Sequence, residues 1–566
     1  MADPAGTESD GVARLGELLT NYGIDTRGPR GVVALLTERP RELAELVGES
    51  GLPRRAVQEL LAAVQPDLVE SPDGVRLAES EVPAYRALID YAALYRTALA
   101  DPLLRREPER ARLAADLSEL IDAAPRARAA LDHVSATPDT VARRALWLDS
   151  RYDLAGAHVV CVGDHDLTSL AIATVSARVR VSVIDVDDNL MAYLDRVAAG
   201  RSLDLRCYFA DLRFGLPPGL LESADLIVTD PPYTPIGVEL FLARGLQLLR
   251  DHLRGRLVLA YGFSDLQPML GLKVQAGLHH LQLVHEEILP RFNRYRAAQA
   301  IGSASDQYLL RPTSKSRRIA ERVVADPPEA IYTHGQNSLE GHRDGLADDV
   351  AEAIYQAGRN IGTAPDRPSG PILIGPRWPA AMRQLPGMRL ATLLSTGLPS
   401  ASADGGASID LSADSGSLLL RVLLAGNAAR LAVLLPSGHP DLAGNRAELA
   451  ELIGPKYVLR ARPAPDARYV ILEADPSSAT NDADRLVGQV LHRAHGKIAN
   501  VWRDALIATS RTADGPVLTK NEARALVADA SVGPPPDCRL LDLPRHALAP
   551  LLAQLRDAAA RLTADV

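Results

Sequence analysis

Three short motifs that are rich in carboxylates each follow an apolar run. They are Gly163 to Asp166, Asp185 to Asp188 and Asp230 to Tyr233. Short apolar runs separated by helical stretches indicate buried parallel strands, and ligands of such sheets bind beyond the carboxyl ends of the strands. Because these ends are acidic, we expect a cationic ligand there.

The turn after the first run favours a nucleoside over a dinucleotide. It carries one glycine, Gly163, whereas dinucleotide-binding turns carry three. Asp185 follows about 20 residues later, where a carboxylate can accept hydrogen bonds from ribose hydroxyls. Asp211, after the next run, can reach the amino group of an adenine. Each residue alone is also typical of a solvated turn, but together they favour an adenosyl ligand such as a sulfonium nucleoside.

The most specific motif is Asp230, Pro231, Pro232 and Tyr233. The prolines restrict the backbone, so that the Asp230 side chain and the carbonyls of Asp230 and Pro231 can be held toward an amine. The ring of Tyr233 can pack against a cation or a flat group. The motif suits an amine nitrogen that attacks a carbon attached to a sulfonium. A rigid loop without chemistry is the alternative.

An attacking amine must be neutral, so a base near it has to accept a proton. Asp164, His165, Asp166 and Asp230 follow neighbouring strands, and crowded carboxylates raise one another's pKa, which suits a base. The same carboxylates would attract the charged ends of a polyamine. Asp164 can also serve as the N-cap of the following helix, and the two roles are compatible.

The elements around these motifs predict a doubly wound α/β unit. We expect strands at 158–162, 180–184, 205–209, 225–229, 256–260, 280–284 and 306–310. We expect helices at 167–178, 188–199 and 237–250. With its helical lead-in, this Rossmann-like, methyltransferase-type unit is predicted to span residues 81–325.

Residues 13–80 predict a winged-helix domain. A helix, a glycine turn and a second helix are followed by two short strands around Pro72, Asp73 and Gly74, which is a hairpin signal. The functional interpretation is DNA binding, and the alternative is a docking or dimerisation module. Only Arg54 and Arg55 mark the second helix, which favours the alternative.

Residues 366–566 predict an α+β domain of their own, in which no chemistry-bearing motif occurs. The expected strands are 417–424, 429–435, 456–461 and 468–473, and residues 401–406 form an expected small-residue loop. The expected helices are 442–453, 482–508, 520–530 and 546–563. Between the two units, residues 332–342 are polar and contain glycine, which is typical of a linker or of an active-site lid.

Composition excludes several classes of function. The 566 residues carry a net charge of −9, so a nucleic-acid partner is not expected. Three isolated cysteines give neither a disulfide framework nor a zinc signature, and we predict no bound metal. No apolar run is long enough to span a membrane and no signal peptide opens the chain. We therefore expect a cytoplasmic protein.

The motifs together resemble the branched-chain polyamine synthases, which are N4-bis(aminopropyl)spermidine synthases. The resemblance covers roughly residues 15–310 and rests on Thr137-Pro-Asp-Thr140 with Arg143 and Arg144, Gly163-Asp-His-Asp-Leu-Thr-Ser169, Ile184-Asp-Val-Asp187 and Asp230-Pro-Pro-Tyr-Thr234. It implies a winged-helix domain on a Rossmann-like catalytic domain in a homodimer. It also implies transfer of an aminopropyl group from decarboxylated S-adenosylmethionine to the secondary amine of spermidine, with release of methylthioadenosine.

With this resemblance, the expected site has two parts. The expected catalytic residues are Asp164, His165, Asp166, Asp230 and Tyr233. The expected donor-binding residues are Gly163, Asp185, Asp187, Asp211, Pro231 and Pro232. The chain departs from the family pattern at His165, where the family has an acid, and at His133, where it usually has Gln. The segment from about 330 to 566 has no counterpart in the family.

Two other functions fit the same residues. An S-adenosylmethionine-dependent N-methyltransferase is one, because Asp-Pro-Pro-Tyr also marks enzymes that methylate exocyclic amines of nucleobases; its acceptor would be a small amine or a nucleobase. The other is a non-catalytic regulator in which a winged helix is coupled to a ligand-sensing domain. The retained Asp164, Asp166 and Asp230 favour an enzyme.

Overall fold

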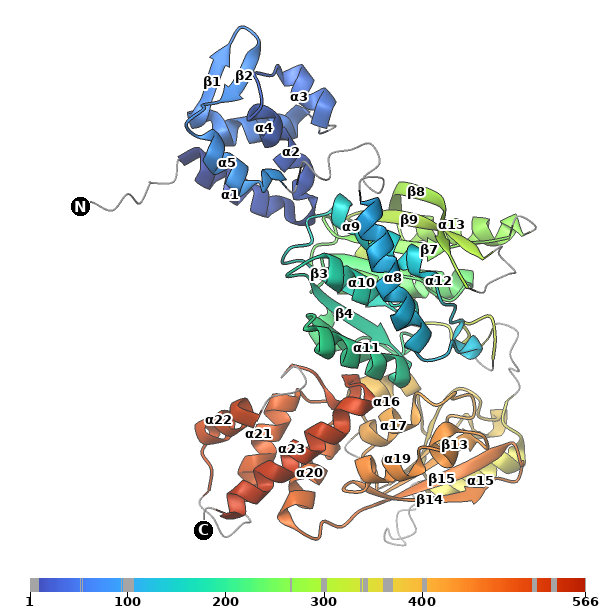
Figure 1. The fold of residues 1–566 in the computed structure, drawn as a ribbon. Coiled ribbons are helices and arrows are strands. Elements are labelled where there is room, and N and C mark those ends of the chain that lie inside the picture. Colours follow the sequence, from blue (N-terminus) through green and yellow to red (C-terminus); the bar gives the residue numbers. More distant parts are fainter. Residues whose placement is uncertain are drawn as a thin grey trace.

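The chain forms three stacked units in the computed structural model (Figure 1). The structure describes residues 10–564, apart from 51, 53, 93, 95–105, 265–266, 297–302, 336–337, 339–344, 360–369, 400–404, 512–516 and 531–536. The predicted domain limits stay predictions, and the expected start at residue 366 lies outside the described residues. None of the described helices combines the length and the apolar character that crossing a bilayer requires.

The N-terminal unit is helical, with one β-hairpin. Its elements are α1 (Asp10–Tyr22), α2 (Arg27–Leu36), α3 (Leu43–Ser50), α4 (Arg54–Val64), β1 (Leu68–Ser71), β2 (Gly74–Leu77) and α5 (Val82–Leu88). The predicted hairpin is confirmed, because β1 and β2 pair antiparallel around the turn. The unit buries its own apolar core, which includes Leu15, Val33 and Leu60. Its assignment as a winged helix stays a prediction, and Gly51 of the expected glycine turn lies outside the described residues.

Two helices lead into the middle unit, α8 (Glu107–Ala123) and α9 (Pro138–Arg151). The start of α9 follows from its sequence. The Thr137 hydroxyl accepts a hydrogen bond from the amide of Thr140 at 3.3 Å, and Pro138 occupies the first helical turn. This helix carries Arg144 toward the middle sheet.

The middle unit is a seven-stranded sheet in the order β5-β4-β3-β6-β7-β9-β8. Its strands are β3 (His158–Val162), β4 (Arg180–Asp185), β5 (Leu205–Phe209), β6 (Leu226–Thr229), β7 (Arg256–Tyr261), β8 (Leu283–Arg294) and β9 (Ala304–Pro312). Its helices are α10 (Thr168–Val175), α11 (Asp188–Arg201), α12 (Pro235–Leu248), α13 (Pro268–His280) and α14 (Ser316–Val323). The first five strands are parallel, and β9 runs antiparallel to both of its neighbours.

The predicted alternation of strands and helices is confirmed for this unit, with one correction. The expected strand at 280–284 is wrong at its start, because α13 continues to His280 and β8 begins at Leu283. Strands β3, β6 and β7 are buried along their whole length. Burial on both faces explains why these strands are continuous apolar runs in the sequence.

The order of the strands reverses between β3 and β6. From β3 the chain continues to β4 and β5 on one side, and then returns to β6 and β7 on the other. Val162 pairs with Thr229, so Gly163 and Asp230 follow at adjacent strand ends. An open α/β sheet has its ligand crevice at such a reversal.

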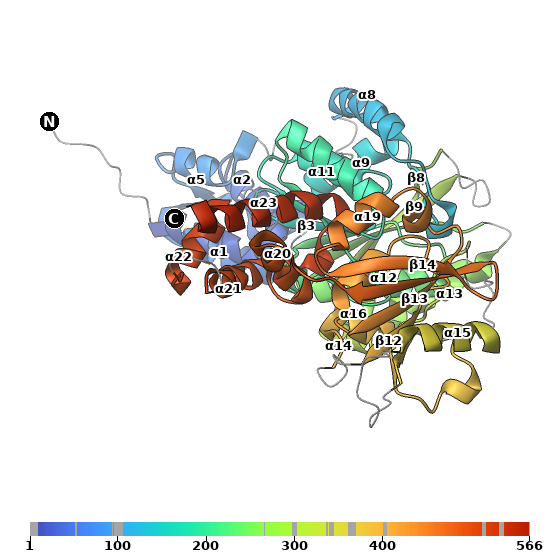
Figure 2. The ribbon, with the colours of Figure 1, turned by 90° about the horizontal axis from the view of Figure 1, so that it is seen from below.

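The C-terminal unit contains a six-stranded sheet in the order β11-β10-β12-β13-β15-β14, followed by helices. Its strands are β10 (Ile372–Ile374), β11 (Gly387–Met388), β12 (Gly406–Asp410), β13 (Arg430–Pro436), β14 (Tyr457–Pro463) and β15 (Tyr469–Pro476). Its helices are α15 (Asp348–Gly358), α16 (Leu390–Thr396), α17 (Leu419–Ala425), α18 (Pro440–Ala443), α19 (Arg446–Ile453), α20 (Asp482–His492), α21 (Ile498–Ser510), α22 (Lys520–Ala530) and α23 (Arg545–Ala564). Figure 2 shows the sheet with α15 on one side of this unit and helices α20 to α23 on the other.

Several predictions for the C-terminal unit are wrong. Residues 417–424 were expected to form a strand, yet Leu419–Ala425 is the helix α17, and every residue of it is buried. An apolar run that is buried on all sides carries no period that separates helix from strand. The single helix expected at 482–508 is two helices, with a break that contains Gly496. Residue 406, placed in a loop by the sequence, begins β12.

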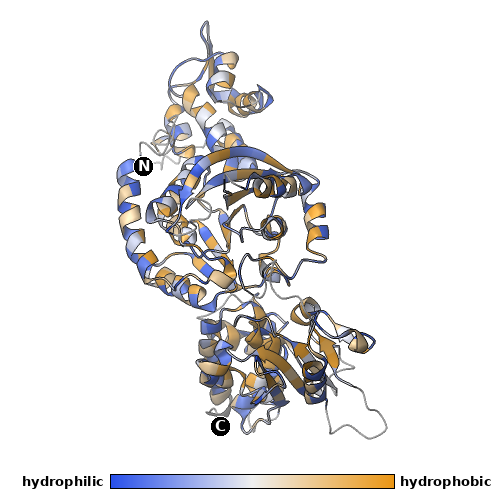
Figure 3. Ribbon diagram, turned by 90° about the vertical axis from the view of Figure 1, so that its right-hand side faces the viewer, coloured by the Kyte–Doolittle hydropathy of each residue, from blue (hydrophilic) through white to orange (hydrophobic). Residues whose placement is uncertain are grey.

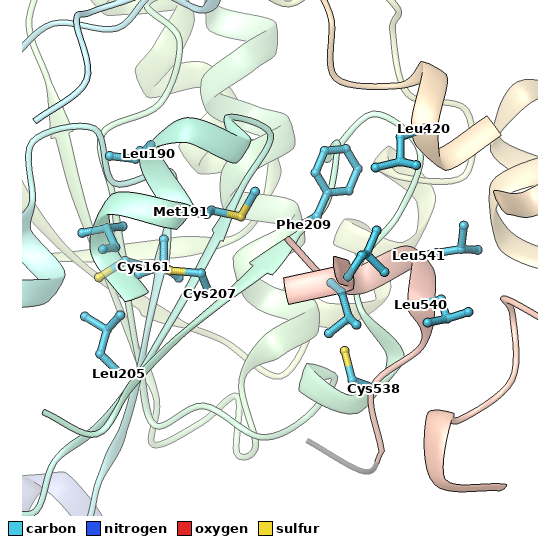
Figure 4. Packing of buried hydrophobic residues seen from close by; sticks show 14 of the residues in the cluster. Cys161, Leu190, Met191, Leu205, Cys207, Phe209, Leu420, Cys538, Leu540 and Leu541 are labelled. Carbon is cyan, nitrogen blue, oxygen red and sulfur yellow. The ribbon is translucent and has the colours of Figure 1, made fainter. Parts of the chain in front are cut away.

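One apolar core joins the middle and C-terminal units. It includes Leu190 and Phe209 from the first and Leu420 and Leu541 from the second. In Figure 4 the side chain of Phe209 extends toward Leu420 of the C-terminal unit. Figure 3 shows apolar strands inside both units and polar residues along the outer helices. The last third of the chain is therefore packed onto the middle sheet rather than tethered to it.

Candidate active site

A pocket lies at the reversal of the middle sheet, beyond the carboxyl ends of β3, β4, β5 and β6. It contains about 720 Å³ of space that protein atoms do not fill, counting its open mouth. The residues predicted for the site that line it are Gly163, Asp164, His165, Asp166, Asp185, Asp230, Pro232 and Tyr233. The structure thus brings together the three motifs that the sequence singled out.

The turn after β3 supplies the floor of the pocket. Gly163 has φ +72°, a left-handed conformation that favours glycine. The Asp164 carboxylate accepts hydrogen bonds from the amide of Ser169, at 3.1 Å, and from its hydroxyl. Asp164 therefore holds the start of α10 and lines the pocket at the same time. Burial, together with the nearby Asp166, raises the pKa of Asp164 well above its ordinary value.

Arg144 is the central cation of the site, a role that was not predicted from the sequence. Its guanidinium is 2% exposed and forms ion pairs with Asp166 and, at 3.0 Å, with Asp230. The Asn293 side chain accepts a hydrogen bond from Nε at 2.7 Å. Asp166 is therefore held by a buried arginine, and its negative charge is balanced inside the wall of the pocket.

Asp230 combines this ion pair with a second donor. The Tyr295 hydroxyl donates to Oδ2 at 2.7 Å, and the Tyr233 hydroxyl lies 3.4 Å from Oδ1. Burial raises the pKa of Asp230 to about 6, although Arg144 and Tyr295 oppose this shift. Such a carboxylate is mostly ionised at neutral pH and still binds a proton more readily than an exposed aspartate does.

Asp185, at the end of β4, is held by three backbone amides. Oδ1 accepts from Val186 at 2.7 Å and from Asp187 at 2.8 Å, and Oδ2 accepts from Asp164 at 3.2 Å. Burial raises the pKa of Asp185 to about 6, against the effect of these amides. A carboxylate offers about four acceptor positions, so one remains for a ribose hydroxyl.

Three residues predicted to bind the donor lie outside the pocket lining. Asp187 caps α11 and accepts from the amide of Asn189 at 3.0 Å. Asp211 is bound by Arg213, whose Nη2 lies 2.6 Å from Oδ2 and whose Nε lies 3.0 Å from Oδ1. Pro231 is buried next to the pocket. The roles proposed for these three residues stay predictions.

Two histidines form part of the wall. The rings of His133 and His165 are stacked, with centroids 4.4 Å apart and planes at 15°. Burial lowers the pKa of each to about 4, so both are neutral at pH 7. The Nδ1 atom of each is buried and has no hydrogen-bond partner within the part of the chain that the structure describes. A flat, neutral surface therefore replaces the acid of the family pattern.

The segment after the middle unit covers one side of the pocket. Ile331 and Tyr332 line it, and Tyr332 is 5% exposed. Asp132 fixes this segment, because its carboxylate accepts from the Thr333 amide at 2.8 Å and from the Thr333 hydroxyl at 2.6 Å. The structure describes residues 332–335 and 338 of the expected linker or lid. The first of these, Tyr332, forms part of the wall of the pocket.

The pocket thus combines anionic and neutral surfaces around a crevice. The carboxylates of Asp164, Asp185 and Asp230 come from three strand ends, while Phe241 and Tyr332 supply apolar walls. Among the described residues, no group of three or more His, Cys, Asp or Glu side chains is placed to hold a metal ion. These surfaces suit a cationic ligand with a flat group and a sugar.

Comparison with known proteins finds similarity to one enzyme family in the middle part of the chain. Residues 112–332 match the family model described as the branched-chain polyamine synthase A C-terminal domain. This stretch is therefore similar to the C-terminal domain of the branched-chain polyamine synthases. It contains α9, the whole middle sheet and the covering segment up to Tyr332.

Curated proteins also match parts of the chain. An uncharacterized protein of Methanocaldococcus jannaschii is 32% identical over 203 residues, which are 36% of this chain and 49% of that protein. The N(4)-bis(aminopropyl)spermidine synthase of Thermus thermophilus is 34% identical over 125 residues, 22% of this chain and 36% of that enzyme. The chain spans only about a third to a half of the length of these relatives.

A solved synthase structure also matches part of the chain. The branched-chain polyamine synthase of Thermus thermophilus, in complex with N4-aminopropylspermidine and 5′-methylthioadenosine, is 23% identical. The comparison covers 54% of this chain and 93% of that one, with a TM-score of 0.32.

Proposed function

We propose that the pocket transfers an aminopropyl group from decarboxylated S-adenosylmethionine to an amine of a spermidine-like polyamine and releases methylthioadenosine. The observation that carries this proposal is the meeting of Asp164, Asp185 and Asp230 in one pocket at the reversal of the sheet. Curated relatives that are named N(4)-bis(aminopropyl)spermidine synthases support it.

The donor would lie across the ends of β3 and β4. The remaining acceptor position of Asp185 suits a ribose hydroxyl, and the apolar walls suit a base. The carboxylates near the β3 turn attract the positive sulfonium. They would also repel the carboxylate of intact S-adenosylmethionine, which favours the decarboxylated donor.

The chemical step needs one proton acceptor. The amine nitrogen attacks the propyl carbon attached to sulfur, a C–N bond forms, and the C–S bond breaks. The electron pair of that bond goes to sulfur, which becomes the neutral thioether of methylthioadenosine. Asp230, with a pKa of about 6, is the base that we assign to the proton of the attacking amine.

The remaining negative charge of the pocket would attract the polyamine that accepts the aminopropyl group. A polyamine carries several ammonium groups, and the carboxylates of Asp164 and Asp185 face the same pocket. His165 is neutral and presents a buried Nδ1 that is unpartnered within the described residues. In place of an acid, it would position an amine by accepting a hydrogen bond rather than by charge. The homodimer that the resemblance implies stays a prediction.

The decisive experiment supplies each donor separately. Decarboxylated S-adenosylmethionine with spermidine should give methylthioadenosine and an aminopropylated polyamine. Formation of S-adenosylhomocysteine from intact S-adenosylmethionine would instead establish a methyltransferase, and binding without either product would establish a ligand sensor. Asp230→Asn should abolish turnover, whereas Asp204→Asn, at an exposed position outside the pocket, should not.

A further inference from the structure

The C-terminal sheet repeats the topology of the middle sheet. In the middle sheet, β3 has β4 and β5 on one side and β6, β7, β9 and β8 on the other. In the C-terminal sheet, β10 has β11 on one side and β12, β13, β15 and β14 on the other. The strand directions also agree, with a parallel set followed by an antiparallel pair. Only a counterpart of β5 is missing among the described strands.

The repeat extends to the residues at the reversal. Ile374 pairs with Ile409, as Val162 pairs with Thr229, and the next residues are Gly375 and Asp410. Gly375 has φ +114°, so both sheets place a left-handed glycine after the first strand. Both sheets also place an aspartate at the end of the opposite strand, because Asp230 directly follows β6 and Asp410 is the last residue of β12.

Each of these aspartates is paired with an arginine. Arg377 Nε lies 3.2 Å from Asp410, just as Arg144 lies 3.0 Å from Asp230. Both reversals therefore pair a buried aspartate with an arginine. The two arginines come from different places in their units.

One equivalent position has the opposite charge. In the middle sheet Val162 pairs with Ile184, and the following residue is Asp185, which faces the pocket. In the C-terminal sheet Ile374 pairs with Met388, and the following residue is Arg389. An acid suited to ribose hydroxyls is therefore replaced by a guanidinium.

A second cavity lies at this second reversal. It contains about 1010 Å³ of unfilled space, counting its open mouth, and Gly375, Arg377, Arg389 and Asp410 line it. Apolar residues Phe214, Met388, Leu390, Leu411 and Leu418 form further parts of its wall. The cavity therefore has the position of a ligand site in an open α/β sheet.

The charged side chains of the cavity differ in how strongly other protein groups bind them. Asp410 is bound by Arg377, and Asp414 accepts from the amides of Leu418 and Leu419. Arg389 is 68% exposed, and its ion-pair partner Asp326, at 3.3 Å, is 95% exposed. An exposed pair of this kind contributes little and exchanges readily for a stronger anion. Arg389 is thus the cation that is available to a ligand.

We propose that this second cavity binds a nucleoside that carries a phosphate on its ribose. A carboxylate at the end of the second strand accepts from ribose hydroxyls, whereas an arginine there accommodates a phosphate on the same edge of the sugar. A guanidinium matches the geometry of a phosphate through paired hydrogen bonds. The apolar wall formed by Phe214, Met388 and Leu411 receives the base.

Arg213 lies between the second cavity and the first pocket. Arg213 lines the second cavity, is bound by Asp211, and donates to the carbonyl of Glu329 at 3.0 Å. Its guanidinium carbon lies 5.9 Å from the ring centroid of Tyr332, which lines the first pocket. The Arg213 side chain therefore separates a ligand in the second cavity from Tyr332 in the wall of the first pocket.

Calorimetric titration of the full chain with adenosine 2′-monophosphate and adenosine 3′-monophosphate tests the proposal. We expect saturable binding of at least one of them, weaker binding of adenosine, and a loss of at least tenfold in affinity for Arg389→Glu. Arg383→Gln, an exposed arginine outside the cavity, is the matched control and should bind as the parent does.

Two further variants separate the two cavities. Ala391→Phe places a bulky ring in the second cavity and should abolish binding, whereas Asp185→Asn in the first pocket should leave it unchanged. Absence of saturable binding at millimolar nucleotide, equal binding of inorganic phosphate alone, or full affinity in Arg389→Glu would each overturn the proposal.

Discussion

Arg421 lies flat against Phe209, with its guanidinium carbon 3.9 Å from the ring centroid, and its Nη2 is 3.0 Å from Asp188. Arg421 belongs to α17 in the C-terminal unit, whereas Phe209 ends β5 and Asp188 begins α11. The same Asp188 carboxylate accepts from the amide of Arg545 at 2.7 Å. The last third of the chain thus holds the segment that directly follows Asp185.

Arg421→Ala should destabilise the protein strongly. The side chain is 1% exposed, and its removal leaves a cavity beside Phe209 and takes from the partly buried Asp188 its arginine ion-pair partner. We expect a loss of about 3 kcal/mol in the free energy of unfolding, measured by urea denaturation. Arg446→Ala, on the exposed surface of α19, should change it by less than about 0.5 kcal/mol. Equal stability of the two variants would contradict this account of the interface.

Arg144→Gln should reduce the proposed aminopropyl transfer by roughly a hundredfold or more. Without the guanidinium, the buried carboxylates of Asp166 and Asp230 repel each other and Asp230 is held protonated. The measurement is the rate of methylthioadenosine release with saturating donor. Arg143→Gln is the matched control, because Arg143 contacts Phe292 outside the pocket, and its rate should stay near that of the parent.

The pH dependence of the transfer should follow Asp230. Because burial raises the pKa of Asp230 to about 6 and the base must be ionised, kcat/KM should rise through about pH 6 and then level. Tyr295→Phe removes a hydrogen bond to the ionised carboxylate and should move this limb upward by about one pH unit. Tyr193→Phe, whose hydroxyl donates to a distant carbonyl, should leave the limb in place.

The stacked histidines should make stability fall with acid. Burial lowers the pKa of His133 and of His165 to about 4 in the folded state, whereas an unfolded histidine titrates near 6.5. Their contribution is therefore complete above about pH 6.5 and is lost as the pH falls toward 4. The double variant His133→Gln/His165→Gln should lose less stability between pH 7 and pH 5 than the parent, as urea midpoints would show. An unchanged difference would exclude this pair as its source.

Asp132→Ala should weaken substrate binding and leave the chemical step intact. The variant removes two hydrogen bonds that hold Thr333, and with it Tyr332, at the wall of the pocket. We expect KM to rise about tenfold and kcat to change by less than about twofold. Asp122→Ala, an exposed aspartate paired with Arg296, is the control. A fall in kcat without a change in KM would show that Asp132 acts on chemistry instead.

The ends of the middle strands were predictable from local patterns, because full burial makes β3 a continuous apolar run and the edge strand β5 alternates between buried and more exposed residues. The bounds predicted for 158–162 and 205–209 agree with β3 and β5, and the carboxylate motifs then had to meet at one edge. In contrast, α17 could not be told from a strand, because all of its residues are buried. A continuous apolar run therefore predicts that an element is buried, but it does not separate a strand such as β3 from a helix such as α17.

The arginine partners of the carboxylates were not predictable from spacing. Arg144 lies 86 residues from Asp230 in the chain, and only the packing of α9 against the sheet brings the two together. Arg213 is different, because it lies two residues after Asp211 and binds it locally. A basic residue so close to a candidate acid was the signal that this carboxylate had a partner of its own.

The core shared by Phe209, Leu420 and Leu541 sets an order of events during synthesis. The ribosome completes the middle sheet long before Leu541 leaves it, so an apolar surface of the nascent chain stays uncovered for a time on the order of tens of seconds. Chaperone dependence and premature aggregation should therefore concentrate in products that end before Leu541.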